Sequence, residues 1–155
     1  MRASDIKAVL RLAIESGNHK PIFLWGPPGV GKSQIIREIA DEKKIGLVDL
    51  RMALLDPTDL RGIPIPKDNQ AFWLPPTFLP NIARDGERGI FLLDELNAAP
   101  PLVQASGFQL VLDRRVGEYT LPPLWMIVAA GNRLGDRGIT HRVPSPLINR
   151  FTHLE

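Results

Sequence analysis

The chain has 155 residues, a length that fits one domain with its own hydrophobic core. Apolar residues make up 44% and charged residues 23%, as in globular proteins, and the lack of cysteine excludes a disulfide scaffold and thiolate zinc sites. The formal net charge is +2 without any Lys/Arg block of the kind that coats nucleic acid, so the composition gives no clear indication of a nucleic-acid partner.

The first fifty residues predict a helix, a strand, a glycine-rich loop, a second helix and a second strand. Apolar residues recur at helical spacing over 4–16, and Gly17 suits the C-terminus of that helix. Residues 22–25 form a short apolar run, and helical spacing returns from Lys32. A further apolar run at 47–50 predicts the second strand.

A proline-rich segment precedes the remaining elements. Residues 56–80 carry six prolines and alternating apolar pieces, which we interpret as an ordered insertion with room for a hairpin. The runs 89–93 and 125–130 are apolar on both faces, as in strands buried between helices of a parallel sheet, and the first should be central. A helix is expected over 100–112, and 151–155 begins another strand. Strands that alternate with helices predict an α/β fold.

The loop after the first strand carries a phosphate-binding motif. Its residues fit the pattern G-x-x-x-x-G-K-[ST] and are Gly26, Pro27, Pro28, Gly29, Val30, Gly31, Lys32 and Ser33. The glycines let backbone N–H groups turn toward phosphates, and the following helix adds the positive end of its dipole. Lys32 is expected to reach the β- and γ-phosphates, and Ser33 to bind Mg²⁺. An ordinary Gly/Pro turn explains this spacing poorly, so we predict nucleotide binding.

Asp94 and Glu95 end the apolar strand at 89–93, at the edge of the sheet where α/β proteins bind ligands. Asp94 is expected to hold Mg²⁺, and Glu95 to orient and deprotonate the water that attacks the γ-phosphate. The alternative is that both acids merely cap the next helix. Their place after a buried strand, in a chain that carries the phosphate loop, favours catalysis.

Asn132 follows the second buried strand. Its amide could hydrogen-bond the attacking water or the γ-phosphate. An Asn after a Gly is also common in turns, so a purely structural role stays open.

In chain order, GPPGVGKS at 26–33, IFLLDE at 90–95, AAGN at 129–132 and LINRF at 147–151 resemble the AAA+ superfamily, in particular its MoxR and dynein-related branch. The resemblance covers nearly the whole chain, and we expect residues 1–155 to form one nucleotide-binding α/β core. It implies a three-layer P-loop core with a central parallel sheet and helices on both faces, in which the sensor strand lies between the phosphate-loop strand and the strand that ends in Asp94. Asn132 would be the sensor of the γ-phosphate. Hairpins within 56–80 and 114–121 would project toward a ring pore or a partner.

Arg150 lies where the family has an arginine finger, which reaches the nucleotide of the neighbouring subunit. Arg142 is the competing candidate, and a surface salt bridge is the structural alternative for Arg150. The chain departs from MoxR-like proteins at Ala98, where Arg is common, and no part of 1–155 resembles the helical lid that carries the family's second sensor Arg. We therefore expect a truncated chain, or one that borrows the missing groups.

The resemblance implies a Mg-ATP hydrolase in a homo-oligomeric ring, a hexamer in many relatives, that remodels a protein substrate, often one with a von Willebrand A domain. Two alternatives remain: a nucleotide-binding switch without turnover, and a P-loop small-molecule kinase. No run approaches eighteen apolar residues and the N-terminus lacks the apolar core of a signal peptide, so we expect no membrane association and a cytoplasmic location.

Overall fold

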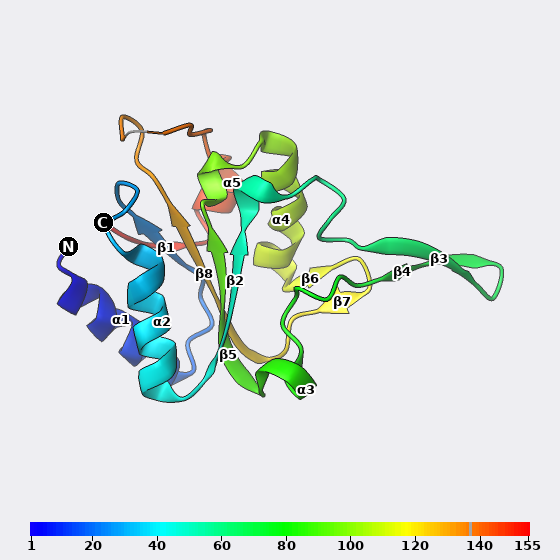
Figure 1. Ribbon diagram of the computed structural model, residues 1–155, viewed down its shortest axis with the longest axis horizontal. Helices are drawn as coiled ribbons and strands as arrows, with labels where there is room; N and C mark the ends of the chain where they lie inside the picture. Colours follow the sequence, from blue (N-terminus) through cyan, green and yellow to red (C-terminus); the bar gives the residue numbers. More distant parts are fainter. Residues whose placement is uncertain (137) are drawn as a thin grey trace.

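A parallel sheet of five strands, in the order β2-β5-β8-β1-β9, forms the centre of the computed structural model, which describes residues 1–136 and 138–155 (Figure 1). The sheet strands are β1 (Ile22–Trp25), β2 (Gly46–Arg51), β5 (Arg88–Asp94), β8 (Leu124–Gly131) and β9 (Thr152–Leu154). The helices are α1 (Ala3–Ser16), α2 (Lys32–Lys43), α3 (Ile82–Asp85), α4 (Pro101–Asp113) and α5 (Ser145–Ile148), with 3₁₀ turns at Met52–Leu54 and Leu96–Ala98. The α/β three-layer prediction is confirmed.

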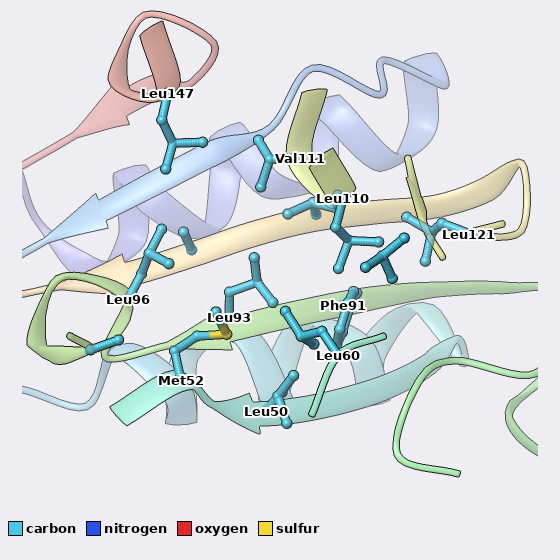
Figure 2. Packing of buried hydrophobic residues seen from close by; sticks show 14 of the residues in the cluster. Leu50, Met52, Leu60, Phe91, Leu93, Leu96, Leu110, Val111, Leu121 and Leu147 are labelled. Carbon is cyan, nitrogen blue, oxygen red and sulfur yellow. The ribbon is translucent and has the colours of Figure 1, made fainter. Parts of the chain in front are cut away.

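Helices cover both faces of the sheet (Figure 1). Along β5, Ile90 and Leu92 face the cluster that includes α1 and α2 side chains, whereas Phe91 and Leu93 face the cluster beneath α4 and α5. Figure 2 shows the second cluster, with Phe91 and Leu93 among leucines of α4 and the neighbouring loops. Because successive side chains of a strand point to opposite faces, a strand covered on both sides is apolar throughout. None of the helices in the described ranges is long and apolar enough to cross a membrane.

The strand order brings the motif-bearing strands together. β8 takes the middle of the sheet, and β5, expected to be central, lies beside it with β2 on its other side. β1 pairs with β8, so the phosphate-loop strand lies next to the sensor strand, as expected. Since all of these pairs are parallel, the loops after Trp25, Asp94 and Gly131 meet at one edge of the sheet.

A row of three residues crosses the other end of the sheet. Gly46 of β2 pairs with Gly89 of β5, which pairs with Trp125 of β8. A Cβ atom on Gly89 would lie 2.5 Å from the indole ring of Trp125, and one on Gly46 would lie 2.9 Å from it. The indole N–H donates to the carbonyl oxygen of Gly86 at 3.1 Å. The two glycines therefore make room for a fully buried tryptophan.

The insertion at 56–80 contains the antiparallel hairpin β3 (Ile63–Lys67) and β4 (Gln70–Leu74), which extends away from the body (Figure 1). A smaller hairpin, β6 (Arg115–Val116) and β7 (Tyr119–Thr120), precedes β8. The Tyr119 hydroxyl donates to the carbonyl oxygen of Pro80 at 2.6 Å and ties the smaller hairpin to the end of the insertion. Both predicted hairpins are present.

Candidate active site

The phosphate loop connects β1 to α2 and depends on two glycines. Gly29 and Gly31 have φ angles of 81° and 85°, which residues with a Cβ rarely adopt. Gly31 is the N-cap of α2, and its carbonyl oxygen accepts from the backbone N–H of Ile35. The first turn of α2 therefore points its free N–H groups at the loop, the arrangement that binds anions.

The Lys32 ammonium lies inside this loop. It donates to the carbonyl oxygens of Gly26 at 2.7 Å and Pro27 at 2.9 Å, and to Oδ1 of Asn132 at 3.4 Å. Burial lowers the pKa of Lys32 below its ordinary value, and the negative charge of Asp94 partly opposes this shift. A half-buried cation beside backbone donors is suited to an oligophosphate, which would supply the missing negative charge.

Ser33 and Asp94 are in direct contact. The Ser33 hydroxyl donates to Oδ2 of Asp94 at 2.7 Å, and Oδ1 of Asp94 accepts from the backbone N–H of Glu95 at 2.9 Å. Glu95 has a left-handed backbone, with φ 55°, and is exposed. A left-handed backbone conformation is energetically costly for a residue with a Cβ atom. The turn that sets the direction of the Glu95 side chain is therefore held at an energetic cost. Glu95 is also the N-cap of the 3₁₀ turn Leu96–Ala98, but its side chain makes no capping hydrogen bond.

Asn132 is held by a residue that the sequence analysis passed over. Asn97 is 3% exposed, and its side-chain amide pairs with both backbone groups of Asn132. Asn132 does not adopt the left-handed conformation that favours Asn in turns. The sequence feature that could have indicated a role for Asn97 is its place as a polar residue in the otherwise apolar stretch after Glu95.

A cavity of about 270 Å³ joins these groups. Its lining includes Pro28, Gly29, Gly31, Lys32, Ser33, Asp94, Glu95 and Asn132. An adjacent cavity of about 220 Å³ is lined by Gly26, Pro27, Val30 and apolar side chains such as Ile6, Trp25 and Ile35. The first suits a polyphosphate with a cation, and the second suits a flat apolar base.

The donor set fits Mg²⁺ bound together with phosphates. Ser33 and Asp94 offer a hydroxyl and a carboxylate oxygen 2.7 Å apart. The described ranges contain no group of three or more His, Cys, Asp or Glu that could hold a metal on its own. Mg²⁺ commonly takes one or two protein oxygens and completes its shell with phosphates and water.

The two candidate finger residues lie outside the phosphate cavity of their own chain. Arg150 follows the C-cap of α5, and Arg142 lines a separate cavity of about 200 Å³ with Trp25 and Asn97. Both arginines are exposed, and neither forms a salt bridge with another residue in 1–136 or 138–155. The salt-bridge explanation for Arg150 therefore has no support among the residues that the structure describes.

Known proteins with similar sequences include two midasins. The chain is 31% identical to midasin of Giardia intestinalis over 161 aligned residues, with 97% of this chain and 3% of that protein covered. It is also 31% identical to midasin of Dictyostelium discoideum, over 149 aligned residues that cover 87% of this chain and 2% of the relative. The chain thus spans a small fraction of the curated relatives that it matches.

Solved structures share the fold at lower identity. A candidate ATPase from Cytophaga hutchinsonii superimposes with a TM-score of 0.66 at 22% identity, over 96% of this chain and 45% of that one. The RuvB Holliday junction branch migration motor of Thermotoga maritima gives a TM-score of 0.59 at 18% identity, over 97% and 42%. These similarities support the fold alone.

The family model that matches is the AAA domain of the dynein-related subfamily, over residues 21–151. The match begins just before β1 and ends at Phe151, so it contains the phosphate loop, the Asp94-Glu95 pair and Asn132. The chain therefore belongs to the dynein-related subfamily of AAA domains, and it is an AAA+ ATPase core.

Proposed function

We propose that this chain binds Mg-ATP and hydrolyses it as a subunit of a homo-oligomeric ring, and that turnover remodels a protein partner. The observation that carries the proposal is the convergence of Lys32, Ser33, Asp94, Glu95 and Asn132 on one cavity of about 270 Å³. Such a constellation combines a phosphate-binding cation, oxygen ligands for Mg²⁺ and a carboxylate base for the attacking water, three of the groups that phosphoryl transfer to water uses.

The phosphate loop and α2 would bind the nucleotide. Backbone N–H groups of 26–33 would surround the phosphates, and the Lys32 ammonium would exchange its contacts with the carbonyls of Gly26 and Pro27 for phosphate oxygens. Ser33 and Asp94 would hold Mg²⁺, which when bound neutralises charge on the β- and γ-phosphates. The adenine ring would enter the adjacent apolar cavity near Trp25 and Val30.

Residues in the loops after β5 and β8 would catalyse hydrolysis. Glu95, exposed at the cavity, would accept a proton from the attacking water. Asn132 lines the same cavity and would orient that water or the γ-phosphate through its side-chain amide.

Assembly into a ring supplies the group that a single chain lacks. Arg150 is exposed and unpaired within the described chain, so it is free to reach a neighbouring nucleotide. An arginine finger accelerates phosphoryl transfer by about 10³ to 10⁵, so the isolated subunit should turn over slowly. We propose a hexameric ring, in which the β3-β4 hairpin faces the pore or a partner, such as a protein with a von Willebrand A domain.

The test is phosphate release from Mg-ATP across a wide range of protein concentration, with assembly followed by light scattering. Turnover per subunit should rise steeply as the chain assembles. Glu95→Gln should keep ATP binding and lose turnover, because the amide cannot accept the proton.

Two results would contradict the proposal. Tight nucleotide binding without release at any concentration, and with no difference between wild type and Glu95→Gln, would indicate a switch. Transfer of the γ-phosphate to an added small molecule in place of water would indicate a kinase.

A further inference from the structure

The side chain of Asn97 pairs with the backbone of Asn132 at two points. Its Oδ1 accepts from the N–H of Asn132 at 3.0 Å, and its Nδ2 donates to the carbonyl oxygen of the same residue at 2.6 Å. The primary amide thus occupies the place of a neighbouring strand just where β8 ends, at Gly131. Two reciprocal bonds fix a backbone unit in both position and orientation, which one bond does not.

The surroundings are shaped to admit this amide. A Cβ atom on Gly131 would lie 2.4 Å from Oδ1 of Asn97, so a side chain at that position would displace it. The carbonyl oxygen of Asn97 also accepts from the backbone N–H of His141 at 2.6 Å. Asn97 therefore joins the turn after Glu95, the end of β8 and the segment that leads to α5.

We propose that Asn97 is a positioning residue that holds Asn132 in register with Glu95, so that the sensor amide meets the γ-phosphate. This inference rests on the roles proposed above for Glu95 and Asn132. The strand pairing of β8 ends at Gly131, and the Lys32 contact of Asn132, at 3.4 Å, is too long to hold the residue firmly. The buried amide of Asn97 supplies the missing constraint.

The decisive experiment compares affinities for ADP and for a non-hydrolysable ATP analogue, together with kcat and KM for ATP. Asn97→Asp keeps the shape and the bond from the Asn132 N–H, but it places an oxygen against the Asn132 carbonyl; Asn97→Ala removes both bonds. Both variants should bind ADP as wild type does and lose most of the preference for the ATP analogue. Their kcat should fall roughly tenfold or more with little change in KM, as for loss of one transition-state contact.

Gln104 provides the matched control. It is also a fully buried amide, it donates to the carbonyl oxygen of Ala99 at 3.0 Å, and its Oε1 has no partner in the described part of the chain. Gln104→Met should leave the ATP-to-ADP preference and kcat unchanged. An equal loss in Gln104→Met and Asn97→Asp would overturn the proposal, as would failure of both Asn97 variants to fold.

A double-variant cycle shows whether Asn97 acts through Asn132. If it does, the double variant Asn97→Ala/Asn132→Ala should have the same kcat and the same ATP-analogue preference as Asn132→Ala alone. Additive losses in these two quantities would overturn the inference. If the wild-type chain binds ATP but does not hydrolyse it, the proposed function is wrong. The affinity comparison would still decide the role of Asn97, because it needs binding alone.

Discussion

The hydroxyl of Ser33 donates a 2.7 Å hydrogen bond to Oδ2 of Asp94, and so joins the first turn of α2 to the end of β5. The two residues are separated by 61 positions in the sequence and by β2, the insertion and α3 in the chain order. This contact brings together the two oxygen groups proposed above to hold Mg²⁺.

Removal of either partner should impair the Mg²⁺-dependent part of nucleotide binding. Ser33→Ala deletes the hydroxyl, and Asp94→Asn removes the carboxylate charge with little change in shape. We expect ATP affinity in excess Mg²⁺ to weaken roughly tenfold or more, since hydrogen bonds to charged groups are worth about 1.5 to 3 kcal/mol. Titration with Mg²⁺ at constant nucleotide measures the effect. Ser16→Ala on α1, whose hydroxyl donates to its own helix, is the control, and an unchanged Mg²⁺ requirement in Asp94→Asn would contradict the assignment.

Lys32 should make the stability of the nucleotide-free chain depend on pH. Burial lowers the pKa of Lys32 below 10.5, so the folded chain binds fewer protons than the unfolded chain between the lowered pKa and 10.5. The free energy of unfolding contributed by this residue therefore increases as the pH rises through that window, and below the window the cost of burying the ammonium is fully present. Urea denaturation at several pH values measures the free energy of unfolding of wild type and of Lys32→Met. The value for wild type should rise relative to that of the variant as the pH becomes alkaline. A fall in the stability of wild type relative to the variant at alkaline pH would contradict the burial of the Lys32 ammonium.

Arg150 should act on the nucleotide of a neighbouring subunit. Arg150→Ala should lower turnover in the assembled state by about 10³ or more without weakening ATP binding. Mixing equal amounts of Arg150→Ala and Glu95→Gln, each inactive alone, should restore roughly a quarter of the activity, because intact Glu95 then meets intact Arg150 at some interfaces. Arg142→Ala is the matched variant, because Arg142 is also exposed and precedes α5, the helix that Arg150 follows. Recovery with Arg142→Ala in place of Arg150→Ala would assign the finger to Arg142.

Gly89 and Gly107 should respond to alanine in opposite ways. A Cβ on Gly89 would lie 2.5 Å from the buried ring of Trp125, so Gly89→Ala should lower the free energy of unfolding by about 1 to 3 kcal/mol or more. Gly107 is inside α4, where alanine favours the helix by up to about 1 kcal/mol, and the atom it would meet is the flexible end of Met52 at 3.2 Å. Guanidinium denaturation of both variants tests the contrast. A Gly89→Ala variant as stable as wild type would show that Trp125 can move aside, and a destabilised Gly107→Ala would show that Met52 cannot.

Much of the fold could be predicted because its signals are local. Periodicity located α1, α2, α4 and the long strands, and Gly17 marked the end of α1, where it adopts the left-handed conformation that few other residues tolerate. The β3-β4 hairpin followed from alternation between prolines. The position of β8 at the middle of the sheet, with β5 beside it, depended on which strands pair, and pairing is decided by packing between distant segments.

The sequence by itself identified the phosphate loop and the acid pair after β5, because each motif places particular residues at fixed spacing next to a strand. It also offered Asn132 as a candidate, beside a purely structural alternative. The part played by Asn97 was decided only by tertiary structure. An asparagine in a short turn carries no local signal of its partner, and its pairing with Asn132 exists because parallel strands β5 and β8 end side by side. The orientation of Arg150 toward solvent likewise arises from how α5 packs, through Leu147, against the sheet.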